Sequence, residues 1–179
     1  MTKPDGVSST WTRFERTGAL VDLDRAIDLA QEAVEAATSN HPDRAVLLNN
    51  LGTALRSRFE RTGALVDLDR AIDLAQEALA ASPADTLRYP TILNNLGAML
   101  FEVGRRDEAL SVAAEAVAIR RRLAEENPAS YASDLAMSLN NLGAMLSEVG
   151  RRDEALSVAA EAVAIRRRLA EENPASYAS

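Results

Sequence analysis

Apolar residues recur along the chain at helical spacing, in stretches that end at glycine or proline. In one of them Leu93, Leu96, Gly97 and Leu100 follow the i, i+3, i+4, i+7 spacing of one face of an α-helix. Gly104 follows this face and is the expected C-cap, because glycine accepts the left-handed conformation in which many helices end. The pattern therefore predicts a helix that ends at Gly104.

A second helical pattern follows after a short turn. Asp107 is the expected N-cap of this second helix, and Glu108 lies near its positive end. Pro128 is expected to end it, because proline disfavours the helical conformation in the preceding residue. Its apolar side carries Ala109, Ala113, Ala116, Val117 and Ile119. The unit is thus predicted to be a helix, a short turn, a second helix and a polar link.

The pattern recurs because the sequence is internally duplicated, and such repeats decide the fold. Residues 13–33 read RFERTGALVDLDRAIDLAQEA, and the same letters return at residues 58–78. Residues 93–133 and 139–179 also match, with a single difference, Phe101 against Ser147. We expect one array over residues 1–179, with units at approximately 1–42 (partial), 43–86, 87–129 and 130–179. The last residues, 174–179, lie where another first helix should begin, which favours a longer array.

Glycine recurs inside the apolar stripe of each first helix, at Gly52, Gly97 and Gly143. A glycine inside a helix costs about 1 kcal/mol relative to alanine. Because this cost is repeated in three helices, we expect a neighbouring helix to approach the backbone closely at each of these positions.

The repeated unit resembles the tetratricopeptide repeat, whose pattern is W-x2-L-G-x2-Y, then A-x3-F, then P. Here L-x2-L-G-x2-L begins at Leu93, A-x3-A begins at Ala109, and Pro128 follows. Leucine replaces the Trp and Tyr, alanine replaces the Phe, and the period is longer. The extra length is expected in a longer second helix in the C-terminal half and around RSRFERTG in the N-terminal half. Long-period arrays with the element LNNLG are similar to those of kinesin light chain and of bacterial signalling ATPases and CHAT proteases.

This resemblance implies an all-α fold, a right-handed α-solenoid of stacked antiparallel helix pairs. It also implies a protein-interaction scaffold that binds an extended peptide or partner segment in a concave groove. The alternative is a structural spacer, or an array that self-associates end to end through uncapped apolar faces. The face formed by Ala159, Ala162 and Val163 is the example for such self-association.

The candidate groove residues lie opposite the core stripe of each first helix. Asparagine is a modest helix former, yet two adjacent asparagines occur in all three first helices. Because an amide both donates and accepts, it can hold the backbone of an extended peptide. By the resemblance, Asn50, Asn95 and Asn141 are the preferred peptide contacts, whereas Asn49, Asn94 and Asn140 can instead bond between neighbouring helices. It stays open whether all six are only structural. The remaining groove candidates are Phe101, Arg56, Glu102 and Glu148.

The composition of the chain argues against several other classes of function. The net charge of −7 argues against binding to nucleic acid or to an anionic membrane. The absence of cysteine and the single histidine, His41, exclude thiolate chemistry and leave no evident metal site. The other carboxylates fall on helix faces, with no spacing that would bring a pair together in a pocket. The runs Arg120–Arg122 and Arg166–Arg168 are expected to form a solvated face beside neighbouring glutamates. We expect no enzyme activity, no cofactor and a cytoplasmic location, since no signal peptide or membrane span is visible.

Overall fold

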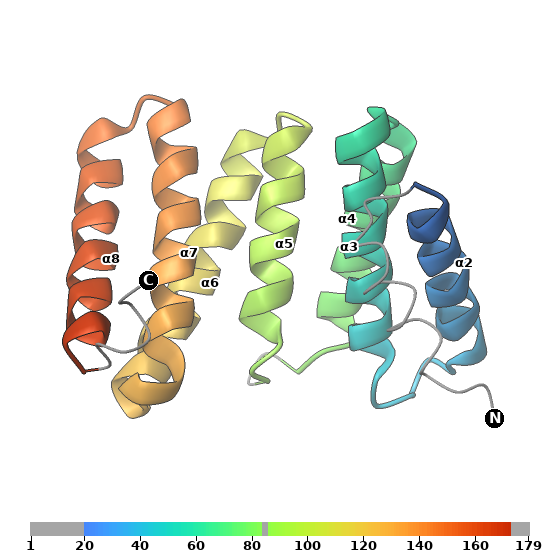
Figure 1. The fold of residues 1–179 in the computed structure, drawn as a ribbon, viewed down its shortest axis with the longest axis horizontal. Coiled ribbons are helices and arrows are strands. Elements are labelled where there is room, and N and C mark those ends of the chain that lie inside the picture. Colours follow the sequence, from blue (N-terminus) through green and yellow to red (C-terminus); the bar gives the residue numbers. More distant parts are fainter. Residues whose placement is uncertain (1–19, 84–85, 173–179) are drawn as a thin grey trace. The chain divides into compact units, whose positions relative to one another are not determined.

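The chain folds into α-helices throughout the part that the structure describes. The structure is a computed structural model that describes residues 20–83 and 86–172. Over these ranges it contains seven helices and no strand (Figure 1). The helices are α2 (Leu20–Ala36), α3 (Arg44–Thr62), α4 (Leu65–Ala80), α5 (Tyr89–Glu102), α6 (Arg106–Glu126), α7 (Pro128–Glu148) and α8 (Arg152–Glu172). The all-α fold class predicted from the sequence is therefore confirmed.

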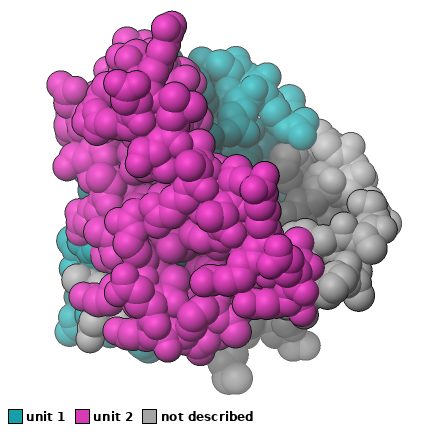
Figure 2. Space-filling model, turned by 90° about the vertical axis from the view of Figure 1, so that its left-hand side faces the viewer, with its two compact units in different colours: residues 1–92 teal, residues 93–179 magenta. Residues whose placement is uncertain are grey.

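The chain divides into two compact units, residues 1–92 and residues 93–179 (Figure 2). The division falls inside α5, so the first turn of that helix belongs to the first unit. In the first unit α3 packs against both α2 and α4. In the second unit α7 packs against both α6 and α8. The predicted limits of the four repeat units remain predictions.

Each unit is held together by the apolar stripes that the helical spacing predicts. In the first unit, Leu48, Leu51 and Leu55 of α3 are at most 3% exposed. They share a core with buried residues of the neighbouring helices: Leu23, Ala26 and Ile27 of α2, and Leu68, Ala71 and Ile72 of α4. Burying these side chains removes apolar surface from water, which is the main force that pairs amphipathic helices.

Glycines end the three first helices in the same way. Gly63, Gly104 and Gly150 have φ angles of 70°, 80° and 81° after α3, α5 and α7 respectively. In this left-handed region a residue with a Cβ atom is strained, whereas glycine is not. The predicted left-handed glycine at Gly104 is thus confirmed, but α5 ends at Glu102, two residues earlier, and equivalent glycines turn the chain into the second helix of each pair.

The extra length of the repeats lies where it was predicted, and also at the start of α7, which has 21 residues against 14 in α5. Helices α6 and α8 have 21 residues against 16 in α4, and α3 extends through RSRFERT to Thr62.

The polar link predicted after Pro128 does not exist, because α7 begins at Pro128 itself. Proline is well suited to the first helical position, where its missing N–H has no intrahelical partner. Asn127 caps this start by accepting a hydrogen bond from the backbone N–H of Ser130, at 3.3 Å.

The predicted N-cap of α6 is also wrong. The helix begins at Arg106 with Arg105 as the N-cap, so Asp107 and Glu108 both lie inside the first turn. Two acidic residues in a first turn are favourable because the N-terminal end of a helix carries partial positive charge. The sequence therefore located the acidic end of the helix correctly and misplaced its boundary.

Candidate interaction surface

The two asparagines of each LNNLG element lie in different environments. The second asparagine is exposed in α3 (Asn50) and in α7 (Asn141), and half-buried in α5 (Asn95). The first asparagine is turned toward the neighbouring helices: Asn49 and Asn140 are half-buried, and Asn94 is buried. This division follows from helical geometry, since adjacent residues are separated by about 100° around the axis.

Asn94 bonds to a neighbouring first helix, as the structural interpretation of that residue anticipated. Its Nδ2 donates a hydrogen bond of 2.8 Å to the hydroxyl oxygen of Ser138 in α7. The same oxygen accepts a hydrogen bond of 2.6 Å from Nη1 of Arg120 in α6. These three buried residues, here called the polar triad, connect α5, α6 and α7. Asn94 is therefore a structural residue within the second unit.

Arg120 corrects the expectation that residues 120–122 form a solvated face. Its side chain is buried, whereas Arg121 and Arg122 are more accessible to solvent. Besides Ser138, the guanidinium contacts the backbone oxygen of Asp134 at 3.0 Å. Burial lowers the pKa of Arg120, because removing a cation from water disfavours its charged form. The helical period alone does not show that Arg120 is buried. Ser138 is a signal in the sequence that a buried polar contact exists, because the equivalent positions of the other first helices are apolar, Leu47 and Ile92.

The first unit contains a different arginine contact that sequence reasoning also missed. Arg58 of α3 forms a bidentate contact with Asp67 of α4, in which Nε and Nη2 each donate to a carboxylate oxygen at 2.7 Å. Its Nη1 donates to the carboxylate of Asp24 in α2 at 3.1 Å. The hydrogen bonds to Asp67 raise the pKa of Arg58. Two carboxylates whose spacing indicated no convergence thus meet at one guanidinium and join three helices.

The remaining groove candidates are all half-buried or exposed. Phe101 is half-buried and lies beneath the guanidinium of Arg106, whose Cζ is 5.9 Å from the ring centroid. Glu102 and Glu148 are exposed, and Arg56 pairs with Glu60 at 3.2 Å along α3. Within residues 20–83 and 86–172, no group of three or more potential ligand side chains is placed to hold a metal ion.

The glycines of the apolar stripe lie against the second helix of the same pair, as predicted. A Cβ atom added at Gly52 would lie 3.3 Å from the backbone oxygen of Ala71. At Gly97 and Gly143 it would lie 3.3 Å and 3.2 Å from a valine methyl group, that of Val112 and Val158 respectively. The small residue thus allows the two helices of a pair to approach closely.

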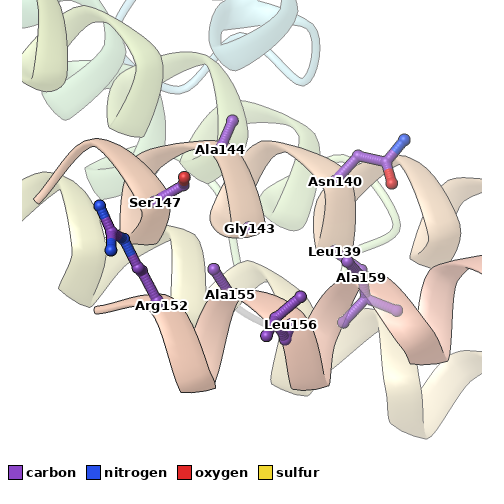
Figure 3. A pocket seen from close by; sticks show the side chains of 9 residues that line it. All are labelled: Leu139, Asn140, Gly143, Ala144, Ser147, Arg152, Ala155, Leu156 and Ala159. Carbon is purple, nitrogen blue, oxygen red and sulfur yellow. The ribbon is translucent and has the colours of Figure 1, made fainter. Parts of the chain in front are cut away.

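A pocket of about 390 Å³ lies between α7 and α8 (Figure 3). Asn140 marks one end of the pocket, and Ser147 and Arg152 mark the other. Between these ends its lining is apolar and includes Gly143, Ala155, Leu156 and Ala159. With the Asn140 amide oriented so that its oxygen faces α8, that oxygen accepts hydrogen bonds from both terminal nitrogens of Arg166, 2.9 Å from Nη1.

Sequence models described as tetratricopeptide repeat match residues 44–85 and residues 88–168, which together are more than half of the chain. Comparison with curated proteins gives no match. No helix in the described part of the chain has the length and apolar character required to cross a membrane.

Solved structures share the fold at low sequence identity. BtubC (BKLC) from P. vanneervenii superposes with a TM-score of 0.72 at 24% identity, over 87% of this chain and 60% of BtubC. A Podosopora anserina kinesin light chain-like protein with nearly identical TPR-like repeats gives 0.69 at 18% identity, over 94% and 78%. MamA gives 0.64 at 20% identity, over 94% and 83%. The chain therefore spans less than two thirds of BtubC, and these likenesses establish a helical repeat solenoid.

Proposed function

Because the chain belongs to the tetratricopeptide repeat family, and is thereby a protein-interaction repeat scaffold, we propose that it binds an extended peptide along its first helices. The peptide contacts are Asn50 in the first unit and Asn95 and Asn141 in the second. No step of this function requires a cofactor or a catalytic group.

The observation that supports this proposal is the difference in environment within each asparagine pair. In α5 the first asparagine, Asn94, is 7% exposed and bonded to Ser138, so a structural need accounts for it. Asn50 and Asn141 are exposed, and exposed asparagines in the middle of helices lower helix propensity. A peptide backbone that accepts from and donates to these amides explains why they occur in each first helix.

The charges beside the asparagines indicate the chemistry of the peptide. Glu102 and Glu148 are both exposed, at the ends of α5 and α7. A peptide with lysine or arginine near these carboxylates would associate faster and more selectively than a neutral one. Contacts of the peptide backbone with Asn95 and Asn141 would fix the position of the peptide along the helices but would not select its sequence.

The test is a random-peptide display selection on the full chain, counter-screened against the triple variant Asn50→Ala, Asn95→Ala, Asn141→Ala. A matched control changes three exposed polar residues of the second helices instead: Gln76→Ala, Ser111→Ala and Ser157→Ala. We expect peptides that bind the parent and the control but not the triple asparagine variant, with both variants folded by circular dichroism. Equal binding to all three proteins, or no enriched peptide, would contradict the proposal.

Self-association is the second candidate function, and the exposed apolar residues of α8 favour it. Ala162 of the face expected for self-association is buried, whereas Val163 is 47% exposed and Leu156 of the same helix is 69% exposed. Exposed apolar side chains that lie together on one helix are typical of protein-binding faces. Sedimentation velocity over a wide concentration range tests this alternative, and a strict monomer at high concentration would count against it.

A further inference from the structure

The second helices of the first unit, α2 and α4, both begin with an apolar pair that is exposed to solvent. Leu65 and Val66 at the start of α4 are 61% and 72% exposed. Leu20 and Val21 at the start of α2 are their copies and are 44% and 72% exposed. These two pairs supply four of the eight large apolar side chains that are exposed among the described residues. Because the same exposure occurs in two identical segments, the repeated sequence itself places these side chains outside the core.

The apolar pairs lie on the extra length that distinguishes the repeats of the first unit. Helix α3 continues for ten residues after Gly52, which lies against Ala71 of α4, whereas α5 continues for five residues after Gly97. Six residues of α4 precede Ala71, whereas three residues of α6 precede its counterpart Ala109. Five further residues of helix extend the α3–α4 pair by about 7 Å beyond the contact between the two helices. The extension therefore carries side chains that the core of the unit does not use.

Arg58 holds the starts of α2 and α4 close together. Its guanidinium donates to Asp67 of α4 and to Asp24 of α2. Asp67 directly follows the apolar pair of α4, and Asp24 lies about one turn after the apolar pair of α2. Both helices begin at the end of the unit at which α3 ends (Figure 1). The two apolar pairs thus form one surface. We call these four side chains the apolar tip: Leu20, Val21, Leu65 and Val66.

Carboxylates continue the exposed face of both helices beyond the apolar tip. In α4 the exposed residues Val66, Asp69 and Asp73 follow the i, i+3, i+7 spacing of one helix face. Helix α2 has the same residues at the same spacing. Together α2 and α4 contain nine carboxylates and two arginines, a net charge of −7, which equals the formal charge of the whole chain. The surface therefore joins aliphatic side chains at one end to negative charge along its length.

We propose that the apolar tip and the acidic face beside it form a docking site for a basic amphipathic helix of a partner protein. The aliphatic side chains of that helix cover the apolar tip. Its lysine or arginine residues, one or two turns farther along, face Asp28 of α2 and Asp69 and Asp73 of α4. This site goes beyond the proposed peptide function, which uses the first helices only.

A helix suits this surface better than an extended segment does, because the surface consists of the side chains of two helices. Beyond their first turns, the backbone groups of α2 and α4 are bonded within the helices, and the first turns supply only N–H groups. An extended segment laid across the apolar tip would therefore leave its own backbone groups unpaired against apolar side chains, which is costly. A helix satisfies its own backbone and presents apolar and basic residues on neighbouring parts of its surface.

The charge of α2 and α4 argues against two other occupants of an exposed apolar surface. A second copy of this chain, docked through the same surface, would bring two sets of nine carboxylates together. A membrane with anionic lipids would repel the same carboxylates. A basic helix instead offers complementary charge, which speeds association and disfavours acidic competitors.

The docking site is separate from the proposed peptide surface. The peptide contacts Asn50, Asn95 and Asn141 belong to α3, α5 and α7, whereas the docking site belongs to α2 and α4. One of the two proposals can therefore fail while the other holds.

The test titrates the full chain into a fluorescein-labelled synthetic peptide and follows fluorescence anisotropy. The peptide is a designed amphipathic helix with leucines on one face and lysines on the other. We expect saturable binding that the double change Leu65→Ser and Val66→Ser weakens by at least about fivefold, because apolar contact area is lost. Adding Leu20→Ser and Val21→Ser should bring the total loss to at least about thirtyfold. All four positions are exposed, so circular dichroism should show an unchanged fold.

Two control proteins make this result specific. The matched control is the double change Leu87→Ser and Met137→Ser, which removes two large apolar side chains that are 55% and 47% exposed elsewhere on the chain. It should bind the peptide within about twofold of the parent. The triple asparagine variant should also bind within about twofold, whatever it does to peptides selected on the proposed peptide surface.

A second set of measurements tests the charges. Asp28→Asn with Asp73→Asn changes the same exposed position in both copies and should weaken binding severalfold at low salt. Raising the ionic strength to about 0.5 M should remove most of this difference, since exposed charges are screened. A peptide with glutamate in place of every lysine should not bind.

Four outcomes would overturn the proposal. The first is no binding of the leucine–lysine peptide at high micromolar concentrations, and the second is equal binding of the glutamate peptide. The third is a loss of binding in the Leu87 and Met137 control as large as that in the Leu65 and Val66 variant, which would mean that any exposed apolar side chain serves. The fourth is self-association of the parent chain that the changes in the apolar tip abolish, which would assign the surface to a second copy of this chain.

Discussion

Helices α6 and α8 have one sequence and two roles within the same unit. Helix α6 packs against α7 with its Leu110 side, while Ala109 and Ala113 lie near Gly97 of α5. Helix α8 packs against α7 through buried residues such as Ala162 and Leu169, and its Glu161 pairs with Arg121 of α6 at 2.8 Å. The shared sequence thus encodes two interfaces, of which α8 uses one. The contribution of a residue to stability is then decided by its neighbour and not by its place in the repeat.

The largest expected effect on stability is the difference between replacing Leu110 and replacing its counterpart Leu156. Leu110→Ala should lower the free energy of unfolding by about 2–5 kcal/mol, because it removes buried methyl groups and leaves a cavity against α7. Leu156→Ala changes an exposed side chain and should alter stability by less than about 0.5 kcal/mol. Urea unfolding of the two variants, followed by circular dichroism at low protein concentration, measures both.

Equal losses of unfolding free energy in Leu110→Ala and Leu156→Ala would contradict the difference between α6 and α8. They would mean that Leu156 is covered in solution, and dilution would then reveal the cause. If the loss at Leu156 disappears on dilution, another copy of the chain covers α8. If it persists, Leu156 is covered within a single chain.

The polar triad is expected to give the next largest effect. Ser138→Ala removes an acceptor from the buried guanidinium of Arg120 and should cost about 1–3 kcal/mol, the usual penalty for a buried polar group left unpaired. Ser147→Ala, at an exposed position of the same helix, should change stability by less than about 0.5 kcal/mol. Unfolding midpoints of the two variants provide the measurement.

A second substitution sharpens the interpretation of this result. Replacing Arg120 by methionine in the Ser138→Ala background should recover stability, because an apolar side chain of similar length needs no acceptor. Failure to recover would show that Ser138 contributes mainly through the hydrogen bond it accepts from Asn94 rather than through the guanidinium.

The part of the fold predictable from sequence is the part specified by periodicity and by backbone geometry. The i, i+3, i+4, i+7 stripe located the core of α5, and the left-handed preference of glycine located the turn at Gly104 that follows this helix. The close approach at Gly97 was likewise predictable, since only contact with another helix justifies the cost of glycine there. Each of these features depends on local sequence alone.

Features that depend on neighbouring helices could not be predicted in the same way. Pro128 is compatible with the end of one helix and with the start of the next, and the cap formed by Asn127 decides between the two. Arg120 and Arg121 are adjacent in one charged run, yet Arg120 is buried against α7 whereas Arg121 pairs with Glu161 of α8 at 2.8 Å. Of the candidate site, the structural role of Asn94 could be anticipated only as one of two alternatives, because its partner Ser138 lies on another helix.

The smallest expected effect tests a place where α6 and α8 should behave alike. Glu108 and Glu154 lie in the first turns of the two helices, and each accepts a two-pronged hydrogen bond from the arginine three residues earlier, Arg105 or Arg151. These hydrogen bonds lower the pKa of both carboxyls below the ordinary value. A lowered pKa in the folded state means that the contribution to stability is present above the unfolded pKa of about 4.3 and is lost as the pH falls through the folded value.

Carboxyl-detected NMR titration should give similar low pKa values for Glu108 and Glu154, because the two first turns have the same sequence and are both exposed. Arg105→Gln should raise the pKa of Glu108 alone, and Arg151→Gln that of Glu154 alone. Added salt should raise both toward the ordinary value, since exposed ion pairs are screened. If instead the two values differed clearly in the parent chain, the neighbours of α6 and α8 would differ at their N-terminal ends as well as along the faces that carry Leu110 and Leu156.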